Sequence, residues 1–211
     1  MSTIVIVGAG PGISAAVARR FAQGGAKVGL IARSEKTVKA VADGITGEVL
    51  PLTADSTDEV GLRAALDRVV AEYGVPDVVV YNAAIIQPDA VGDLTAQQHL
   101  DAWAVNVVGA ITTAAHVVPA MAERGSGSFL ITGGMPETKP EYVSLSMGKA
   151  GVRTLVTLLD QQYGAAGVHA ASVTVGGAVA PGTAHDPDDI AEHYWRLHHQ
   201  PRAHWEHEVS A

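Results

Sequence analysis

Short runs of β-branched and aliphatic residues alternate with helix-like stretches along almost the whole chain. The runs that indicate β-strands cover residues 3–7, 27–32, 48–53, 77–81, 128–132 and 168–175. Helical patterns fill the intervals at residues 12–23, 34–43, 57–73, 95–124 and 142–163. A repeated strand–helix–strand order predicts a parallel sheet whose right-handed crossovers place helices on both faces. We therefore expect an α/β fold, a doubly wound parallel sheet in three α/β/α layers, with residues 1–211 forming a single domain.

The composition supports a buried sheet and excludes several classes of protein. Of the 211 residues, 47% are hydrophobic but only 5% are aromatic, so small aliphatic side chains must build the core, as in parallel sheets covered on both faces. A net charge of -8 without a Lys/Arg cluster argues against nucleic-acid binding, and the absence of cysteine excludes disulfides and thiolate metal sites. The first predicted strand starts at Thr3, leaving no room for a signal peptide, and no uninterrupted apolar run reaches the roughly 18 residues of a membrane span. We expect a cytoplasmic protein without a membrane segment.

The segment 186–211 combines a predicted helix with a polar tail. Asp186 followed by Pro187 is a capping and first-turn signal, which predicts a terminal helix near residues 187–198. Six of the 9 histidines lie in this segment or directly before it: His185, His193, His198, His199, His204 and His207. Their spacing completes no zinc signature, so we expect a solvated polar face and no metal site. Trp195 and Trp205 are expected to anchor the tail to the body or to a partner subunit.

A glycine-rich turn follows the first predicted strand and opens the first predicted helix. It reads Gly8-Ala9-Gly10-Pro11-Gly12-Ile13-Ser14. Glycines allow a tight turn and a close approach of the backbone to a pyrophosphate, which then rests on the amide groups of the helix N-terminus. The strand–turn–helix context predicts a dinucleotide site in a Rossmann-like fold, with Gly8, Gly10, Gly12 and Ile13 among the residues that contact the cofactor. The alternative is a tight turn with no ligand.

The residues after the second predicted strand bear on the choice of cofactor. An acidic residue at this point would bind a ribose 2′-hydroxyl, but the chain has Arg33 followed by Ser34. A guanidinium suits a 2′-phosphate, and a charge-assisted contact of this kind contributes roughly 1.5–3 kcal/mol. We therefore expect NADP(H) to be preferred over NAD(H). The alternative is that Arg33 is a surface residue at the end of a strand.

Several motifs, taken together and in order, resemble those of the short-chain dehydrogenase/reductase family. The resemblance runs from Thr3 to about Val179, and Ser14 replaces the last glycine of the family's glycine motif. It implies that Asp55 lies near the adenine ring, that Asn106 belongs to the catalytic tetrad and that Lys149 holds the nicotinamide ribose. The segment Tyr81-Asn82-Ala83-Ala84 resembles the family's Asn-Asn-Ala-Gly motif, and Gly176-Gly177 stands where the family has the Pro-Gly pair that bends over the nicotinamide.

The chain departs from this family at the residues that carry the chemistry. Family members have a tyrosine four residues before the lysine, but this chain has Leu145, which carries no proton to transfer. The serine that holds the substrate oxygen aligns with Gly134 by motif or with Thr132 by spacing. Loss of a general acid typically costs 10²–10⁴ in rate. Thr132, a water molecule or Tyr142, which lies roughly 10 Å along the helix from Lys149, remains as a proton source.

Three functions are compatible with these observations. The first is an NADP(H)-dependent oxidoreductase with a non-standard proton donor, acting on a small carbonyl compound or on an activated alkene or imine, which demands less of an enzyme acid. The second is an inactive NADP(H)-binding or sensor protein, and the third is a non-redox isomerase or cyclase on the same fold. Helices with many small residues mediate assembly in this family, so a homodimer or homotetramer is expected.

Overall fold

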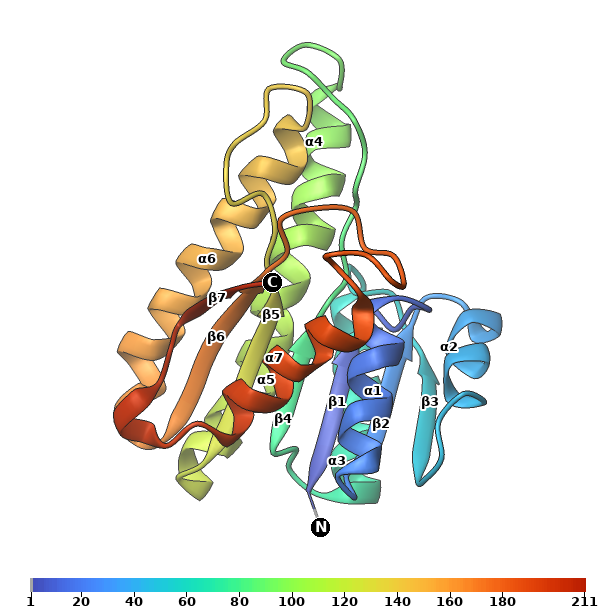
Figure 1. The fold of residues 1–211 in the computed structure, drawn as a ribbon, viewed down its shortest axis with the longest axis vertical. Helices are drawn as coiled ribbons and strands as arrows, with labels where there is room; N and C mark the ends of the chain where they lie inside the picture. The colour runs from blue at the N-terminus through green and yellow to red at the C-terminus, as the bar shows by residue number, and fades with distance from the viewer. Residues whose placement is uncertain (1) are drawn as a thin grey trace.

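Seven parallel strands form a single sheet in the computed structural model, which describes residues 2–211 (Figure 1). Their order across the sheet is β3-β2-β1-β4-β5-β6-β7. The strands are β1 (Thr3–Val7), β2 (Lys27–Ala32), β3 (Val49–Thr53), β4 (Val78–Tyr81), β5 (Gly127–Thr132), β6 (Val168–Thr174) and β7 (Glu208–Ser210). From β1 the chain adds β2 and β3 on one side and β4 to β7 on the other, so the topological switch point lies between β1 and β4. In such sheets the ligand crevice opens at the switch point. The predicted doubly wound, Rossmann-like sheet is therefore confirmed.

Helices cover both faces of the sheet and divide the core in two. One face is covered by α1 (Ile13–Gln23), α2 (Glu35–Ala42) and α7 (Pro187–His199). The other face is covered by α3 (Glu59–Tyr73), α5 (Gly109–Arg124) and α6 (Val143–Tyr163). Alternate residues of each strand point into one core or the other, because side chains of a strand alternate between its two sides. The predicted three-layer α/β/α arrangement is confirmed.

The long helix expected at residues 95–124 is interrupted by a wider turn. It consists of α4 (Ala96–Trp103), a π-helical segment (Ala104–Val108) and α5. In the π-helical segment the Gly109 amide donates to the Ala104 carbonyl, and the Tyr81 hydroxyl donates to the carbonyl oxygen of Val105. The stretch 96–124 is long and apolar enough to cross a membrane, with a mean hydropathy of 1.5 in its best window, but 56% of that window is buried inside the fold. This burial is typical of a helix that packs against the sheet and contributes to the core.

The C-terminal segment is more ordered and more buried than a solvated tail. Val209 in β7 is 5% exposed, and β7 pairs with β6 as a seventh strand that the sequence pattern did not predict. The ring of Trp195 packs edge-on against Phe21 of α1 at 5.1 Å between centroids, and Trp205 stacks on His169 of β6 at 4.6 Å. The prediction that both tryptophans anchor this segment is confirmed, and the anchor is the body of the same chain. Residues 201–204 and 206–208 are exposed, as expected of a polar tail, whereas one side of α7 and Val209 of β7 are buried.

Candidate functional site

The glycine-rich turn connects β1 to α1 at the C-terminal edge of the sheet. Gly8 has a φ of +90°, and its amide and that of Ala9 both donate to the carbonyl of Ile31 at 2.9 Å. A Cβ atom on Gly8 would lie 2.3 Å from the backbone nitrogen of Ala83, after β4. Gly10 and Gly12 have open space on their Cβ side, so a ligand can approach the backbone there. The turn thus has the shape that a pyrophosphate needs at the N-terminus of α1.

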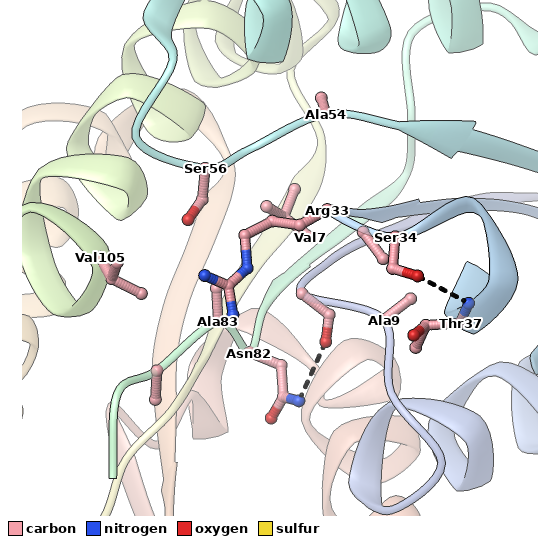
Figure 2. Close-up of a pocket in the computed structure, with 13 residues that line it drawn as sticks. Val7, Ala9, Arg33, Ser34, Thr37, Ala54, Ser56, Asn82, Ala83 and Val105 are labelled. Carbon is pink, nitrogen blue, oxygen red and sulfur yellow. Dashed lines mark hydrogen bonds between the residues drawn. The ribbon is translucent and has the colours of Figure 1, made fainter. Parts of the chain in front are cut away.

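A cavity of about 260 Å³ lies beside this turn, over the ends of β1, β2 and β4 (Figure 2). Predicted cofactor residues that line it are Gly8, Arg33, Ser34, Asn82, Ala83 and Ala84. The guanidinium of Arg33 lies over the cavity rather than away from it (Figure 2), and within residues 2–211 it forms no ion pair. The cavity therefore offers an unpaired cation to an anionic ligand.

Asp55 lies outside the lining of this cavity, whereas Ser34 lines it and also caps the helix that follows. The carboxylate of Asp55 accepts hydrogen bonds from the amide and hydroxyl of Thr57, at 2.9 and 2.8 Å, while its neighbours Ala54 and Ser56 line the cavity. Ser34 caps α2, because its hydroxyl oxygen accepts the amide of Thr37 at 3.3 Å. Its own proton remains available to a ligand.

Lys149 of α6 is buried and points at the end of β5. Lys149 is 8% exposed, and its Nζ donates to the carbonyl oxygen of Thr132 at 2.7 Å. Burial, with a smaller contribution from the Arg153 guanidinium, lowers the pKa of Lys149 to about 8. An ammonium group has three donors, so two remain for a ribose hydroxyl or a water.

Asn106 lies in the π-helical segment, opposite α6. Its Oδ1 accepts the amide of Ile85 at 2.8 Å, and its Nδ2 donates to the carbonyl of the same residue. A Cβ atom on Gly148, next to Lys149, would lie 2.7 Å from the Cβ of Asn106, so only glycine allows this close packing. The π turn thereby places Asn106 between the loop after β4 and the helix that carries Lys149.

The sequence aligned Leu145 with the family's tyrosine and either Gly134 or Thr132 with its serine. Leu145 is 3% exposed and lies one helical turn before Lys149. Gly134 adjoins the lysine, since a Cβ atom there would lie 3.6 Å from the Lys149 Cε. The hydroxyl of Thr132 points to the opposite face of the sheet, where it donates to Asn82 Oδ1 at 2.6 Å. Tyr142 is the N-cap residue of α6, and its backbone pairs with Asp89.

Gly177 lies in the loop between β6 and α7, under the ring of His185. A Cβ atom on Gly177 would lie 2.5 Å from the His185 Nε2. The contact between His185 and Gly177 was not predicted, because nothing in the sequence distinguishes His185 from the other histidines near the C-terminus. Tyr194 of α7 was missed as well: it is fully buried, and its hydroxyl contacts the Thr132 hydroxyl at 2.7 Å. Tyr194 lies four residues after Ile190 and three before Leu197, which places all three on one side of the helix. This spacing is the signal that would have placed Tyr194 in the core.

Replacing Gly8 by alanine tests the geometry of the turn. We expect the free energy of unfolding to fall by about 1–3 kcal/mol, because a left-handed backbone and a contact with the Ala83 nitrogen would both be strained. Urea denaturation of the variant measures this loss. Gly10→Ala is the matched control, since nothing lies within 4 Å of its Cβ position. Equal stability of Gly8→Ala and the wild type would contradict the turn described above.

Comparison with known proteins agrees with this geometry. The profile of the short chain dehydrogenase family matches residues 2–190. The cis-4-hydroxycyclohexanecarboxylate dehydrogenase of Sinomonas cyclohexanicum is 32% identical over 193 residues, which are 88% of this chain and 77% of that enzyme. The probable oxidoreductase EphD of Mycobacterium tuberculosis is 32% identical over 179 residues, which are 82% of this chain and 30% of that protein. A metagenomic short-chain oxidoreductase solved in complex with NADP superposes with a TM-score of 0.91 and 25% identity, covering 100% of this chain and 96% of its own.

The family match extends over most of the sheet, the glycine-rich turn and the helix that carries Lys149. The named relatives are dehydrogenases or oxidoreductases, which supports an oxidoreductase function. The chain belongs to the short chain dehydrogenase family.

Proposed function

We propose that this protein is an NADP(H)-dependent reductase of a small carbonyl compound, or of an activated alkene or imine, that works without the family's tyrosine. The observation that carries the proposal is the cavity between the glycine-rich turn and the unpaired guanidinium of Arg33. A relative of known structure binds NADP, which supports a nicotinamide cofactor in this fold. The preference for the 2′-phosphorylated form rests on Arg33 and on the free proton of Ser34.

The residues present fit a dinucleotide along the C-terminal edge of the sheet. Gly8 to Gly12 and the N-terminus of α1 would hold the pyrophosphate, and the cavity beneath Arg33 would hold the adenosine half. Lys149 would hold the nicotinamide ribose with the two donors that Thr132 leaves free. When bound, the cofactor supplies a hydride to an electrophilic carbon of the substrate.

The proton that must follow the hydride has few sources among the side chains at this site. Leu145 has none, and the Thr132 hydroxyl donates to Asn82 on the far side of β5. We assign the proton to the Lys149 ammonium, delivered directly or through one water to the substrate oxygen or to the second atom of a C=C or C=N bond. The lysine then becomes a neutral amine and regains a proton from solvent. Its lowered pKa suits this role, because a general acid works best near the pH at which it titrates.

A binding protein without turnover is the second candidate, and the apolar side chain of Leu145 one turn before Lys149 favours it. Leu145 has no hydroxyl at the position aligned with the family's tyrosine. The position aligned with its serine is either Gly134, which has no side chain, or Thr132, whose hydroxyl donates to Asn82. Such a protein would retain the cofactor cavity and Arg33 but would transfer no hydride. A non-redox enzyme would differ from both by forming product without consuming cofactor.

Equilibrium titration with NADPH and with NADH, followed by tryptophan fluorescence, tests the proposal. Tight binding of NADPH, followed by its sustained oxidation with a carbonyl, enone or imine substrate, is the expected result. Binding without oxidation across such a panel would support the second candidate instead. No binding of either nucleotide would overturn the proposed function and the binding-protein alternative together.

We also propose that the protein forms a homodimer or homotetramer through the outer face of α4 and α6. Leu100, Trp103 and Met147 line an apolar groove there, and their exposed fractions are 61%, 40% and 62%. Large exposed apolar patches of this kind mark interaction surfaces more often than isolated exposed residues do.

Met147→Glu is expected to shift the protein toward the monomer, because it places a charge in the apolar groove. Light scattering coupled to size-exclusion chromatography measures the mass. Val60→Glu is the control: Val60 is 78% exposed on α3, outside the groove, and its substitution should leave the mass unchanged. A wild-type protein that is already monomeric at the highest concentrations used would contradict the assembly.

A further inference from the structure

A continuous row of side-chain hydrogen bonds crosses the sheet beneath the glycine-rich turn. It starts at the hydroxyl of Tyr194 on α7 and passes through Thr132 at the end of β5 to Asn82 after β4, with distances of 2.7 and 2.6 Å. From Asn82 it continues through Nδ2 to the hydroxyl of Ser14 at 2.7 Å, and Ser14 bonds the carbonyl oxygen of Gly8 at 2.9 Å. Tyr194 is 0% exposed, Ser14 is 1% exposed and Thr132 is 7% exposed. The bond between Tyr194 and Thr132 is therefore protected from competition with water, whereas Asn82 in the middle of the row is half-buried and lines the cavity.

The chemistry of the groups sets one direction for the whole row. Asn82 Oδ1 only accepts, so the single proton of Thr132 is used there and Tyr194 must donate to the Thr132 oxygen. At the other end, the Gly8 carbonyl only accepts, so Ser14 must donate to it and receive its own bond from Asn82 Nδ2. Every hydroxyl in the row thus donates once and accepts once, except Tyr194, which only donates. Such directed rows strengthen each member by polarisation.

The two ends of the row belong to parts of the molecule with different roles. Gly8 is the residue whose left-handed backbone makes the turn, and Ser14 is in the first turn of α1. Tyr194 belongs to a C-terminal helix that lines no part of the cofactor cavity. Thr132 also connects the row to Lys149 of α6, because the backbone carbonyl of Thr132 accepts a hydrogen bond from the Lys149 Nζ. The row therefore connects α7 to both the glycine-rich turn and the lysine of the site.

We infer that Tyr194 is a positioning residue for cofactor binding. Its hydroxyl holds the glycine-rich turn in the binding conformation through Thr132, Asn82 and Ser14. By thermodynamic linkage the effect is reciprocal, so cofactor binding at the turn stabilises α7 in return. The inference rests on the proposed function, since it assumes that the turn binds a nicotinamide dinucleotide.

Tyr194→Phe is the variant that tests this role, since it removes one hydroxyl and leaves the ring in the core. We expect the Kd for NADPH to rise about 3- to 10-fold, the range that one lost hydrogen bond produces. Ser128→Ala is the matched control, because Ser128 also bonds α7 to β5, through His198 Nδ1 at 3.0 Å, but at the opposite end of the strand. Both variants should lose some thermal stability, and only Tyr194→Phe should lose affinity.

A double-mutant cycle separates the hydrogen-bonded row from a general loosening of the fold. Tyr194 and Asn82 are joined through Thr132 and form no direct hydrogen bond, so independent effects on Kd would add. We expect instead that Tyr194→Phe adds little to the Kd increase of Asn82→Ala, because that variant removes both routes from the row to Gly8: the one through Ser14 and the direct bond to the Gly8 carbonyl at 3.4 Å. Hydrogen exchange should show that NADPH protects the amides of α7 in the wild type and protects them less in Tyr194→Phe.

The outcomes distinguish this inference from the proposed function. If the wild type binds NADPH and Tyr194→Phe binds it equally well, the positioning role is overturned and the proposed function stands. Additive effects in the cycle, or an equal loss of affinity in Ser128→Ala, would also overturn the positioning role. If the wild type binds neither NADPH nor NADH, the proposed function itself fails and the positioning role fails with it.

Discussion

Lys149→Met is expected to lower the rate of NADPH-dependent reduction by about 10²–10⁴-fold, the usual effect of losing a general acid. Leu145, one helical turn away, provides no second acid that could replace the lysine. Single-turnover kinetics at saturating NADPH measures the hydride step separately from cofactor binding. Lys139→Met is the control, since Lys139 is an exposed lysine in the loop before α6. A variant that keeps the wild-type rate would exclude Lys149 as the proton source.

The pH profile of the wild type tests the same assignment. Burial lowers the pKa of Lys149 to about 8 from its ordinary value of 10.5, so the ammonium is present below pH 8 and is lost above it. The rate of reduction should therefore be level below pH 8 and fall about tenfold for each unit above it. A profile without a break between pH 7 and 9 would contradict a lysine acid.

The stability of the fold should change in the opposite direction to the activity. Between pH 8 and 10.5 the unfolded chain binds the lysine proton and the folded chain does not, so stability rises with pH in this window. Below pH 8 the buried charge costs stability in full, roughly 3 kcal/mol by the size of the pKa shift. Lys149→Met removes that cost and loses the charged hydrogen bond to Thr132, worth roughly 1.5–3 kcal/mol. The two effects nearly offset each other, so we expect a variant of about wild-type stability at pH 7 that is nearly inactive, which an unfolded variant cannot mimic.

Arg33→Ala is expected to raise the Kd for NADPH about 10- to 150-fold and to leave the Kd for NADH unchanged. The guanidinium has no ion-pair partner within residues 2–211, so the substitution removes a charge-assisted contact with the ligand and breaks no salt bridge in the protein. Fluorescence titration with both nucleotides measures the two constants. The NADPH affinity of the wild type should also weaken with added salt more steeply than that of the variant.

Lys36→Ala separates this specific contact from a general loss of positive charge. Lys36 is exposed on α2, three residues from Arg33, and it does not line the cavity. Its substitution should weaken NADPH binding only slightly. Equal weakening of NADPH and NADH by Arg33→Ala would show that the arginine supports the shape of the site rather than recognising a 2′-phosphate.

The central sheet and the glycine-rich turn could be predicted because their signals are local. Strands β1, β2 and β4 are runs of mainly buried aliphatic residues such as Ile4–Val7, and this pattern is visible in the sequence of each strand alone. Gly8 needs a positive φ, and a short stretch of sequence shows where glycine, turn and helix meet. Ser34 and Asp58 likewise cap the helices that follow them, through bonds to amides three residues ahead. Features that depend on residues within a few positions of each other can be predicted without knowing how the rest of the chain folds.

The parts that sequence reasoning missed depend on partners far away in the chain. The strand β7 has one buried apolar residue, Val209, and exists because β6 offers it an edge to pair with. The wide turn at residues 104–108 is held by the hydroxyl of Tyr81, which no periodicity of the helix itself announces. The same holds for the direction of the Thr132 hydroxyl, which the spacing of motifs left open.

By itself the sequence determined the doubly wound fold, the glycine-rich turn and the placing of Arg33 and Lys149 at one edge of the sheet. These follow from local propensity and from the rule that parallel strands end on the same side. Only the tertiary structure decided that Lys149 is buried against the Thr132 carbonyl and that Tyr194 reaches the glycine-rich turn through three other residues. Burial and hydrogen bonding at these positions come from chain segments 17 and 62 residues apart. Contacts over such separations arise when the layers pack, and a linear pattern does not record them.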